Sequence, residues 1–597
     1  IAKALRAALE ETDGTPLGGV LSLLAVTDGA AARDAENALG VGLPAVTAGT
    51  LALVQALDDS GTRAPLWCVT SGAVHSGRAG QVEPAGSPVQ AQLWGMGQAI
   101  ALEAPGSWGG LIDLPDTTGA EGSDASVMER MCAVLAGDLG NEDQVAVRGS
   151  EVFARRVERA VLTGAGRRFE PRDTALITGG TGSVGGRLAR WLAGRGARHI
   201  VLTSRRGPDA PGAAELVAEL ARAGATATVV ACDVADGEQV RALVERLAAE
   251  GRPVRSVFHT AGVDDTAAFQ DTDADAYAAV LAGKVTGALH LDEALGDSVD
   301  AFVLFSSISG VWGNARHSAY AAANASLDAL AHRRRSLGRT ATSVAWGWWE
   351  GGGLAGEAGV GDALSGLGLS AMSAGPALAA MAQAVEHEET AVVVADVDWA
   401  RFAPVFTAMR PSPLIGDLPE VRGLLSAEDG RDAQDSAEAE GSAPDAAGRL
   451  RAELVELSVP EREFTLLELV RDHAAAVLGL DGPGEVRPDR AFRKLGFDSL
   501  TAVDLRNRVA RATGLKLPAA LVFDHPTPAV LARFLLGRLD LPPVADGDPA
   551  TPPSAAPAPV SAPVPVSAGA ASPVADDSID DLDAESLIQL ALGDNGS

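Results

Sequence analysis

The sequence predicts an α/β protein with two Rossmann-like, doubly wound halves, followed by a small four-helix domain and a short helical tail. Three observations lead to this prediction. Apolar runs of strand length alternate with helical patterns over residues 1–160 (the first half) and, more strongly, over residues 161–410 (the second half). A glycine-rich segment directly follows the first strand of the second half. Helical periodicity then returns over residues 461–541.

Length and composition restrict the class of protein. The 597 residues suggest about four domains. A content of 47% hydrophobic and 21% charged residues is typical of a globular chain. The net charge of −31 disfavours binding to nucleic acid or to an anionic membrane surface. No apolar stretch reaches the ~18 residues that a membrane helix needs.

The cysteines and the first residue indicate the cellular context. Cys68, Cys132 and Cys232 form no CxxC pair, and their spacing supports neither a disulfide framework nor a zinc site. This pattern favours a reducing cytoplasm, and no metal site is expected. The chain begins with Ile1 and has no signal segment, so we expect an internal piece whose natural start lies upstream.

The first half reads as an α/β unit without a cofactor site. Residues 65–70 (PLWCVT) and 109–114 (GGLIDL) are short apolar runs typical of buried strands, and residues 51–57 and 90–103 have helical spacing. This order suits a parallel sheet. Because the segment holds no glycine-rich phosphate loop, we expect it to bind no dinucleotide.

The second half predicts a doubly wound sheet with a dinucleotide site. The expected strands are residues 174–178, 199–203, 228–233, 256–260, 301–306 and 342–346. The first strand runs into TGGTGSVGG, where glycines allow a tight turn close to a pyrophosphate, and the next helix points its first amide groups at the phosphates. The candidate cofactor-binding residues of this loop are Thr178, Gly179, Gly180, Thr181, Gly182, Ser183, Val184 and Gly185.

The residues after the next two strands indicate which dinucleotide binds. An NAD site would place an acidic residue at the end of the second strand, whereas Ser204, Arg205 and Arg206 suit the additional 2′-phosphate of NADP. Asp233, with Val234 beside it, is placed to contact the adenine. The alternative is a glycine-rich turn with a solvent-exposed pair of arginines.

Four residues form a candidate catalytic group. Ser307 lies at the end of a strand, Tyr320 follows 13 residues later, and a tyrosine can protonate the alkoxide that forms in a carbonyl reduction. A phenol with a pKa near 10 works better beside a cation. Dehydrogenases usually place lysine four residues after the tyrosine, where this chain has Asn324, but Lys284 could fill that role from elsewhere. Individually, these residues could also be a turn serine, a half-buried tyrosine and a surface lysine.

The remaining segments predict a tethered helical domain. Residues 411–460 are polar and acidic, typical of a linker, and residues 542–575 are rich in proline and alanine, typical of an extended tether. Between them, Ser499 begins a helix after Asp498; a serine in this position is commonly only a cap. Residues 576–597 have an amphipathic pattern too short to be a stable helix alone, so we expect them to fold onto a partner. A frayed tail is the alternative.

These motifs together resemble one family. GGTGSVGG, FHTAG, Lys284, SS…YAAAN and VAWGWW resemble the ketoreductase domain of modular type I polyketide synthases, which carries the same lysine–asparagine exchange. The first half resembles the non-catalytic structural subdomain of that ketoreductase, without its first strands. LLELVRDHAAAVLG, FRKLGFDSL and FDHPT resemble an acyl carrier protein, and residues 576–597 resemble a C-terminal docking segment. The resemblance thus implies a C-terminal fragment of a synthase.

The resemblance implies roles for individual residues. Tyr320 would be the proton donor, Ser307 would hydrogen-bond the ketone oxygen, Lys284 would lower the pKa of the tyrosine, and Asn324 would support the proton relay. Trp312, eight residues before the tyrosine, marks the A-type stereochemical class. His317, three residues before it, marks the A2 subclass with an L-configured hydroxyl. The Leu-Asp-Asp motif of the other class is not met in register, since residues 263–266 read VDDT. Alternatively, the tryptophan and histidine merely line the groove.

The implied function is reduction of a carrier-bound β-ketoacyl thioester to an L-β-hydroxyacyl thioester with NADPH. Ser499 would carry 4′-phosphopantetheine, attached by a phosphopantetheinyl transferase. The implied partners are ketosynthase and acyltransferase domains upstream, a downstream polypeptide that docks on the tail, and a second copy in a homodimer, in antibiotic biosynthesis. The alternatives are a free-standing reductase of small ketones and an inactive carrier scaffold. The sequence does not specify the product, the acyl chain or the preceding domains.

Overall fold

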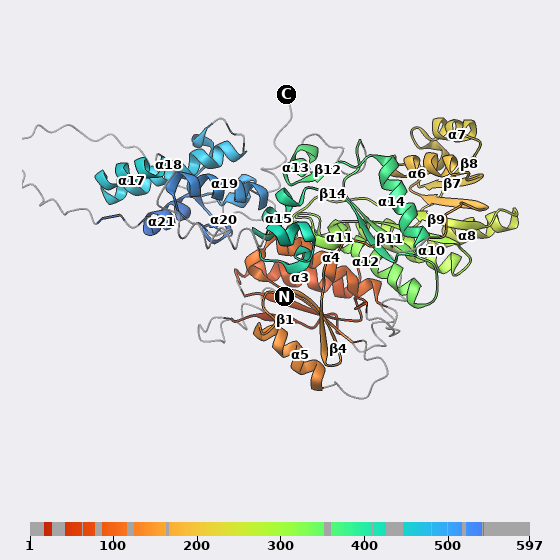
Figure 1. Cartoon of the computed structure of the whole chain (residues 1–597), viewed down its shortest axis with the longest axis horizontal. Helices are drawn as coiled ribbons and strands as arrows, with labels where there is room; N and C mark the ends of the chain where they lie inside the picture. Colours follow the sequence, from red (N-terminus) through yellow and green to blue (C-terminus); the bar gives the residue numbers. More distant parts are fainter. Residues whose placement is uncertain are drawn as a thin grey trace, which may run out of the picture. The chain divides into compact units, whose positions relative to one another are not determined.

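A computed structural model describes most of the chain (Figure 1). The described residues are 17–26, 42–77, 86–115, 125–162, 166–351, 360–424 and 446–542, apart from residues 63, 409, 479, 481, 498, 516, 518–520 and 540. The predicted docking segment, residues 576–597, lies outside these ranges. So does the predicted tether, residues 542–575, except for its first residue.

The first half is an α/β unit built on one five-stranded sheet of order β1-β2-β3-β4-β5. Strands β1 to β4 are parallel, and β4 and β5 form an antiparallel pair at the edge. The predicted strands, residues 65–70 and 109–114, are present with bounds shifted by at most one residue. The predicted helices, residues 51–57 and 90–103, are also present, and they begin six and two residues earlier than predicted. Its elements are β1 (Val20–Ser22), α3 (Ala45–Asp59), β2 (Leu66–Ser71), α4 (Pro88–Glu103), η1 (Pro105–Ser107), β3 (Trp108–Leu114), α5 (Ala125–Ala136), β4 (Gln144–Arg148) and β5 (Glu151–Ala154).

The second half contains a seven-stranded parallel sheet of order β13-β11-β10-β9-β6-β7-β8. The order reverses beside β6, as in doubly wound folds, where ligands bind at the carboxyl ends of the strands next to this reversal. Its elements up to the last sheet strand but one are β6 (Thr174–Thr178), α6 (Ser183–Gly194), β7 (His199–Ser204), η2 (Gly207–Asp209), α7 (Ala213–Arg222), β8 (Thr226–Ala231), α8 (Gly237–Ala249), β9 (Val254–His259), α9 (Ala274–Leu281), η3 (Ala282–Thr286), α10 (Gly287–Leu295), β10 (Ala301–Ser307), α11 (Ser309–Trp312), α12 (Ser318–Ser336) and β11 (Thr342–Trp346).

Three details of this half differ from the sequence prediction. Strand β9 begins two residues and ends one residue earlier than predicted. Strand β8 begins and ends two residues earlier than predicted, so Asp233 lies in the loop that follows it. The edge strand β13 was not predicted; it pairs in parallel with β11. The remaining elements are α13 (Val360–Gly366), β12 (Leu369–Ser370), α14 (Ala374–Glu386), β13 (Ala391–Val394), β14 (Asp396–Val397), α15 (Trp399–Ala408) and η5 (Pro413–Ile415).

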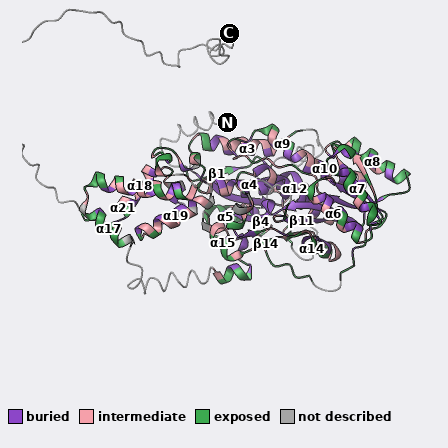
Figure 2. Ribbon diagram, turned by 90° about the horizontal axis from the view of Figure 1, so that it is seen from above, coloured by how far each residue is buried: buried purple, intermediate pink, exposed green. Residues whose placement is uncertain are grey.

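The two halves pack against each other through helices α4 and α12. Helix α4 contains Gly95 and Gly97, and α12 is rich in alanine; a Cβ atom at Gly95 would overlap the main chain of Ala321 in α12. The small side chains therefore allow the two backbones to lie in direct contact. Figure 2 shows buried residues concentrated along these helices and in the strands. Helix α12 also carries Tyr320 and Asn324, two of the four candidate catalytic residues, so the first half packs against the helix that positions them.

A helical domain follows, with its own apolar core. Leu466, Val470, Leu505 and Leu531, together with Leu454 from the preceding helix, are fully buried in this core. The domain consists of α17 (Ala446–Glu456), α18 (Val459–Leu478), η6 (Pro483–Glu485), η7 (Phe492–Leu495), α19 (Ser499–Thr513), α20 (Leu521–Asp524) and α21 (Pro528–Arg538). Helices α18 to α21 are the four that the sequence predicts.

The predicted linker, residues 411–460, includes packed residues at both ends. Leu414, Ile415, Leu418 and Val421 are buried in a cluster with the second half, and α17 packs in the helical domain. We therefore propose a narrower linker, residues 425–445. The apolar residues at the two ends of this segment bury enough surface to give these ends a defined structure. The composition of the whole segment is polar on average, so it did not indicate these apolar ends.

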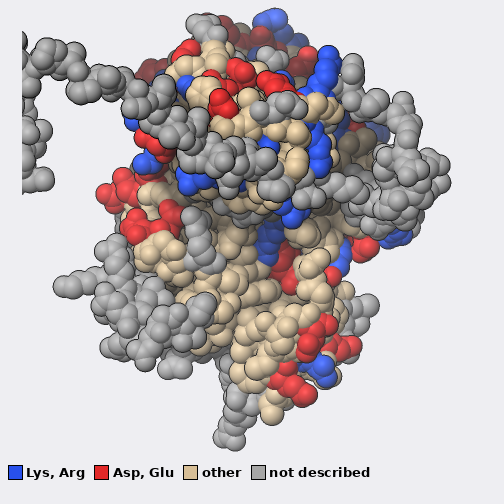
Figure 3. All heavy atoms as spheres, turned by 90° about the vertical axis from the view of Figure 1, so that its left-hand side faces the viewer, with Lys and Arg blue, Asp and Glu red and all other residues tan. Residues whose placement is uncertain are grey.

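The surface carries both signs of charge. Figure 3 shows acidic and basic side chains interspersed on one face. Among the helices of the described ranges, none combines the length and hydropathy of a membrane-spanning segment. The same residues contain no group of three or more His, Cys, Asp or Glu side chains placed to hold a metal ion.

Candidate active site

The glycine-rich loop connects β6 to α6 at the carboxyl edge of the sheet. Gly179 has a φ of +65°, a conformation that favours glycine. A Cβ atom at Gly180 would meet Leu202 Cβ at 2.8 Å, and one at Gly185 would meet Gly180 Cα at 2.7 Å. Helix α6 begins at Ser183 with no side-chain cap, which leaves its first amide groups for an anionic ligand. Because these positions have no side chains, the loop leaves a space beside the helix start that fits the pyrophosphate of a dinucleotide. A side chain at Gly180 or Gly185 would fill this space.

Gly185→Ala is expected to weaken NADPH binding by about tenfold or more. The added methyl group would overlap the main chain of Gly179 and Gly180, so the loop must shift away from its phosphate-binding shape. The matched control is Gly194→Ala at the end of the same helix, where an added Cβ meets nothing within 4 Å. Fluorescence titration with NADPH measures both variants. Equal affinity in the two would contradict the assignment of the loop.

The other predicted cofactor residues lie at the same edge of the sheet. Ser204 ends β7, and its Oγ accepts a hydrogen bond of 3.1 Å from the amide of Gly207. Arg205 and Arg206 follow it and are exposed. Asp233 accepts a hydrogen bond from the Ala235 amide in the loop after β8. Val234 is buried, and its carbonyl oxygen lies 3.0 Å from His290 Nδ1.

The catalytic candidates converge from three elements. Ser307 ends β10, Tyr320 and Asn324 lie one turn apart on α12, and Lys284 projects from η3. The ammonium Nζ of Lys284 lies 5.0 Å from the centroid of the Tyr320 ring and donates a hydrogen bond of 3.1 Å to the carbonyl oxygen of Phe305.

Asn324 and Ser307 complete this polar group. Asn324 Nδ2 donates to the carbonyl oxygen of Tyr320 at 2.7 Å. Its Oδ1 is buried without a hydrogen-bond partner among the described residues, so it is available to a water molecule or a ligand. The amide of Ser309 donates to Ser307 Oγ at 3.2 Å, which orients this hydroxyl at the end of the strand.

Lys284 lies in a π-helical turn that sequence periodicity did not reveal. Residues Ala282–Thr286 form this turn, and such turns are frequent at functional sites. The turn is held by His259, whose Nε2 donates to the Lys284 carbonyl oxygen at 2.8 Å, while its Nδ1 accepts from Thr178 Oγ1 at 2.8 Å. His259 therefore links the strand before the glycine loop to the turn that carries the lysine. The histidine of FHTAG was the only sequence signal for this link.

Burial dominates the electrostatics of the site. It raises the pKa of Tyr320 to about 12, with a further increase from Asp264, while hydrogen bonding with Ser307 and Asn324 lowers it. Burial also lowers the pKa of Lys284 to about 8, and the carboxylates of Asp264 and Asp328 oppose this decrease. Tyr320 is thus a protonated phenol at neutral pH, in the state required of a proton donor.

The predicted stereochemical residues lie beside this group. Trp312 ends α11 and is buried, with Trp399 and Phe402 packed against its ring at centroid distances of 6.2 and 5.5 Å. His317 directly precedes α12, and its Nδ1 lies 2.9 Å from Asp264 Oδ2. Sequence reasoning assigned no role to Asp264.

The turn before His317 is held by the first half. Arg316 has a φ of +67°, an uncommon conformation for a residue with a side chain. Its amide donates to Glu103 Oε1 at 2.8 Å, and the amide of Phe269 donates to Glu103 Oε2 at 3.1 Å. Glu103 is the last residue of α4. Its carboxylate therefore holds two backbone segments in place, the turn before His317 and the segment that follows Asp264.

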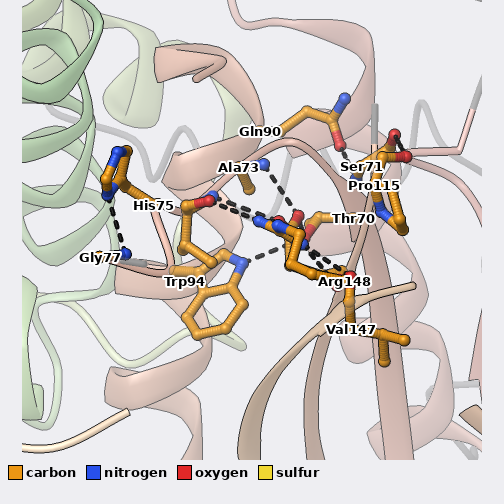
Figure 4. A network of polar contacts seen from close by, with 12 residues as sticks. Thr70, Ser71, Ala73, His75, Gly77, Gln90, Trp94, Pro115, Val147 and Arg148 are labelled. Carbon is orange, nitrogen blue, oxygen red and sulfur yellow. Dashed lines mark hydrogen bonds and ion pairs between the residues drawn. The ribbon is translucent and has the colours of Figure 1, made fainter. Parts of the chain in front are cut away.

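A polar network lies at the carboxyl ends of β2 and β3 in the first half. Asp113, at the carboxyl end of β3, accepts hydrogen bonds from Thr70 Oγ1, the Ala73 amide and Arg148 Nη2 at 2.7, 2.8 and 2.7 Å. Trp94 Nε1 donates to Thr70 Oγ1 at 3.1 Å. Figure 4 shows this network of Thr70, Trp94 and Arg148 in the space above the strand ends. Its ion pair and hydrogen bonds tie β2, β3 and β4 together with helix α4.

Ser499 begins α19 in the helical domain, as the sequence predicts. Its side chain and the preceding Asp498 lie outside the described part of the chain. The residue is therefore at the amino-terminal end of this helix.

Three families match successive parts of the chain. They are described as a polyketide synthase extender module SpnB Rossmann fold domain (residues 2–157), a KR domain (residues 173–351) and a phosphopantetheine attachment site (residues 468–535).

The chain is also similar to individual proteins. "Polyketide synthase GfsA" of Streptomyces halstedii is 47% identical over 91% of this chain, which covers 7% of that protein. "Pikromycin polyketide synthase component PikAIII" of Streptomyces venezuelae is 45% identical over 94% of this chain and 38% of that protein. The solved "Structure of A1-type ketoreductase" is 47% identical with a TM-score of 0.65, over 71% of this chain and 86% of that one. The chain therefore spans less than two fifths of the two curated relatives.

A doubly wound domain with a glycine-rich loop and a convergent tyrosine, serine and lysine defines a nicotinamide-dependent reductase. The similarities specify it further: the chain belongs to the modular polyketide synthases, with a ketoreductase and an acyl carrier domain. A ketoreductase of this family uses NADPH, which the glycine loop fits, and the carrier domain holds a covalent phosphopantetheine.

Proposed function

We propose that the chain reduces a carrier-bound β-ketoacyl thioester to an L-β-hydroxyacyl thioester, while phosphopantetheine on Ser499 holds the acyl chain. The observation that carries this proposal is the approach of Lys284 to Tyr320 beside Ser307, at the sheet edge that bears the glycine loop. These groups come from three separate elements, and a scaffold without chemistry would have no need to bury a lysine next to a phenol.

Each residue has a distinct role in the proposed reaction. NADPH, when bound, supplies the hydride. Tyr320 donates its proton to the forming alkoxide, and Ser307 hydrogen-bonds the ketone oxygen. Lys284 lies against the phenol ring and favours the transfer by its charge, and Asn324 supports the return of a proton to the tyrosine.

The proposed cofactor contacts divide between two parts of the sheet edge. The loop from Thr178 to Gly185 receives the pyrophosphate, and Ser204, Arg205 and Arg206 receive the 2′-phosphate. The two arginines are exposed, so a ligand phosphate can reach both without displacing an internal partner. Asp233 and Val234 flank the adenine.

We infer an A-type stereochemical outcome. It is supported by Trp312 and by the similarity to a structure described as an A1-type ketoreductase. The A2 subclass rests on His317 alone, and its pairing with Asp264 gives this imidazole a fixed orientation. Trp312 is packed among aromatic rings, which favours a role in shaping the wall of the site over direct contact with the substrate.

The carrier domain and the tail imply partners. We propose that a phosphopantetheinyl transferase modifies Ser499, that ketosynthase and acyltransferase domains supply the substrate, and that residues 576–597 dock on a downstream polypeptide. Tethering the substrate on a flexible arm raises its effective concentration at the site. We also propose that two copies of the chain form a homodimer, which would then contain two carrier domains and two docking segments. The proposed domains keep the predicted ranges, with the narrower linker given above.

Chiral analysis of the product tests the proposal. The protein is incubated with NADPH and a diffusible β-ketothioester, NADPH oxidation is followed, and the hydroxythioester is resolved on a chiral column. We expect oxidation of NADPH and an L-configured alcohol. Absence of oxidation would instead support an inactive carrier scaffold. Reduction of small ketones with a preference over thioesters, and no modification of Ser499, would support a free-standing reductase.

A further inference from the structure

A cavity of about 940 Å³ lies between the two halves, separate from the glycine loop. The loop after β2, the segment after β5, helix α12 and the edge strand β13 all line it. One lining residue, Asp328, lies on α12 two turns beyond Tyr320 and one turn beyond Asn324. The spacing of four residues places all three on one face of the helix. The cavity wall and the candidate site are therefore joined by this helix face.

Asp328 is tied to the strands that form the site. Ser343 Oγ of β11 donates to its Oδ1 at 2.6 Å, and Ser306 of β10 also hydrogen-bonds to it. The single hydroxyl proton of Ser306 is shared between Asp328 and the carbonyl oxygen of Asn324, which lies 3.2 Å from the Oγ atom. These contacts fix the carboxylate between two strands and its own helix. Burial raises its pKa to about 6, although both serines, Arg155 and Lys284 lower it.

Two cations interact electrostatically with this carboxylate. Lys284 approaches from η3, and Asp328 raises the pKa of the lysine against the effect of burial. Arg155 approaches from the segment after β5, and burial lowers its pKa while Asp328 and Asp143 raise it. Arg155 Nη1 donates to Gln144 Oε1 at 3.2 Å, which holds the guanidinium in the first half. The charges thus alternate from the first half into the active site.

We propose that Asp328 is a positioning residue of the reductase whose carboxylate keeps Lys284 in its charged form, with Arg155 of the first half compensating the buried negative charge. This inference rests on the function proposed for Lys284. It gives the first half, which has no glycine loop of its own, an electrostatic contribution to catalysis.

Other titratable groups surround the same carboxylate and must be considered in any pH dependence. His75 and His332 stack with ring centroids 5.3 Å apart in the cavity wall, and Arg156 and Glu389 line it as well. Asp264 is the second carboxylate that faces Lys284. His332 lies one turn beyond Asp328 on α12, so His332→Gln is the control that separates imidazole titration from lysine titration.

The test is the pH profile of kcat for Asp328→Asn, with NADPH and the diffusible β-ketothioester. A lysine with a pKa of about 8 is half charged at pH 8, and loss of the carboxylate lowers this pKa further. A decrease by about one unit would reduce kcat about fivefold at pH 8 and hardly at pH 6. We expect the alkaline limb to move to lower pH, with KM unchanged. Asp328→Glu, which restores the charge, should return the limb towards its original position.

A purely structural role would lower kcat equally at every pH and would leave the limb in place, which would overturn the inference. An unchanged profile would also overturn it, as would the same shift in His332→Gln. Should Asp328→Asn fail to fold, as judged by thermal unfolding, Asp328→Ser provides the comparison, since its hydroxyl can still accept from Ser343. Inactivity of the unmodified protein would refute the proposed function itself, so the two failures are distinguishable.

Discussion

Replacing Tyr320 with phenylalanine is expected to reduce ketoreduction by about 10²–10⁴-fold, the range attributed to a single general acid. The phenol is the proton donor nearest to the convergence of Ser307, Asn324 and Lys284, and its pKa of about 12 keeps the proton in place until the alkoxide forms. NADPH binding should remain, because the glycine loop lies on another element. NADPH oxidation with the diffusible thioester measures the loss, and fluorescence titration measures the affinity.

The chain contains only one other tyrosine, which provides a matched control. Tyr277 in α9 is fully buried, and its hydroxyl donates to the Ser318 carbonyl oxygen at 3.1 Å. Tyr277→Phe removes the same atom as Tyr320→Phe and leaves one carbonyl without this donor. It should cost about 1 kcal/mol of stability and little activity. If both variants lost activity alike, or if Tyr320→Phe kept it, another residue would have to supply the proton.

Much of this site follows from sequence because its parts belong to short local patterns. The strands before the glycine loop and before Ser307 are continuous apolar runs, and the glycines cannot be replaced without steric overlap. Parallel strands bring their carboxyl ends to one edge, so residues that follow different strands meet there. For this reason Ser307 and the glycine loop could be expected at one edge without knowledge of the structure.

Other parts depend on contacts that periodicity does not encode. A π-helical turn inserts one residue into a helical pattern, so the direction of Lys284 could not be derived from its neighbours. His259, Glu103 and Asp328 act through partners that are distant in the chain, by as much as 213 residues for Glu103 and Arg316. In addition, β13 was not predicted although its sequence, AVVV, is wholly apolar, because it is an edge strand of only four residues and half of them are exposed.

Replacing Ser499 with alanine is expected to abolish attachment of phosphopantetheine completely, because alanine has no nucleophilic oxygen. Intact-protein mass spectrometry after incubation with coenzyme A and a phosphopantetheinyl transferase measures the attachment. Reduction of the diffusible β-ketothioester should continue, because the carrier serine takes no part in hydride or proton transfer. Reduction of a substrate loaded through coenzyme A should stop, since the tether that raises its effective concentration is lost.

A general weakening of the carrier domain could imitate this result, because a serine that begins a helix often caps it, and an alanine there costs about 0.5–2 kcal/mol. Thr527→Ala separates the two effects. Thr527 caps α21 in the same domain, with its Oγ1 accepting from the Val530 amide at 3.3 Å, so its loss removes a cap without touching the candidate attachment site. Loading that persists in Thr527→Ala and vanishes in Ser499→Ala assigns the chemistry to the serine oxygen. Phosphopantetheine attachment retained in Ser499→Ala would place the arm on another residue. The acyl chain would then be delivered to the reductase from a different position in the carrier domain.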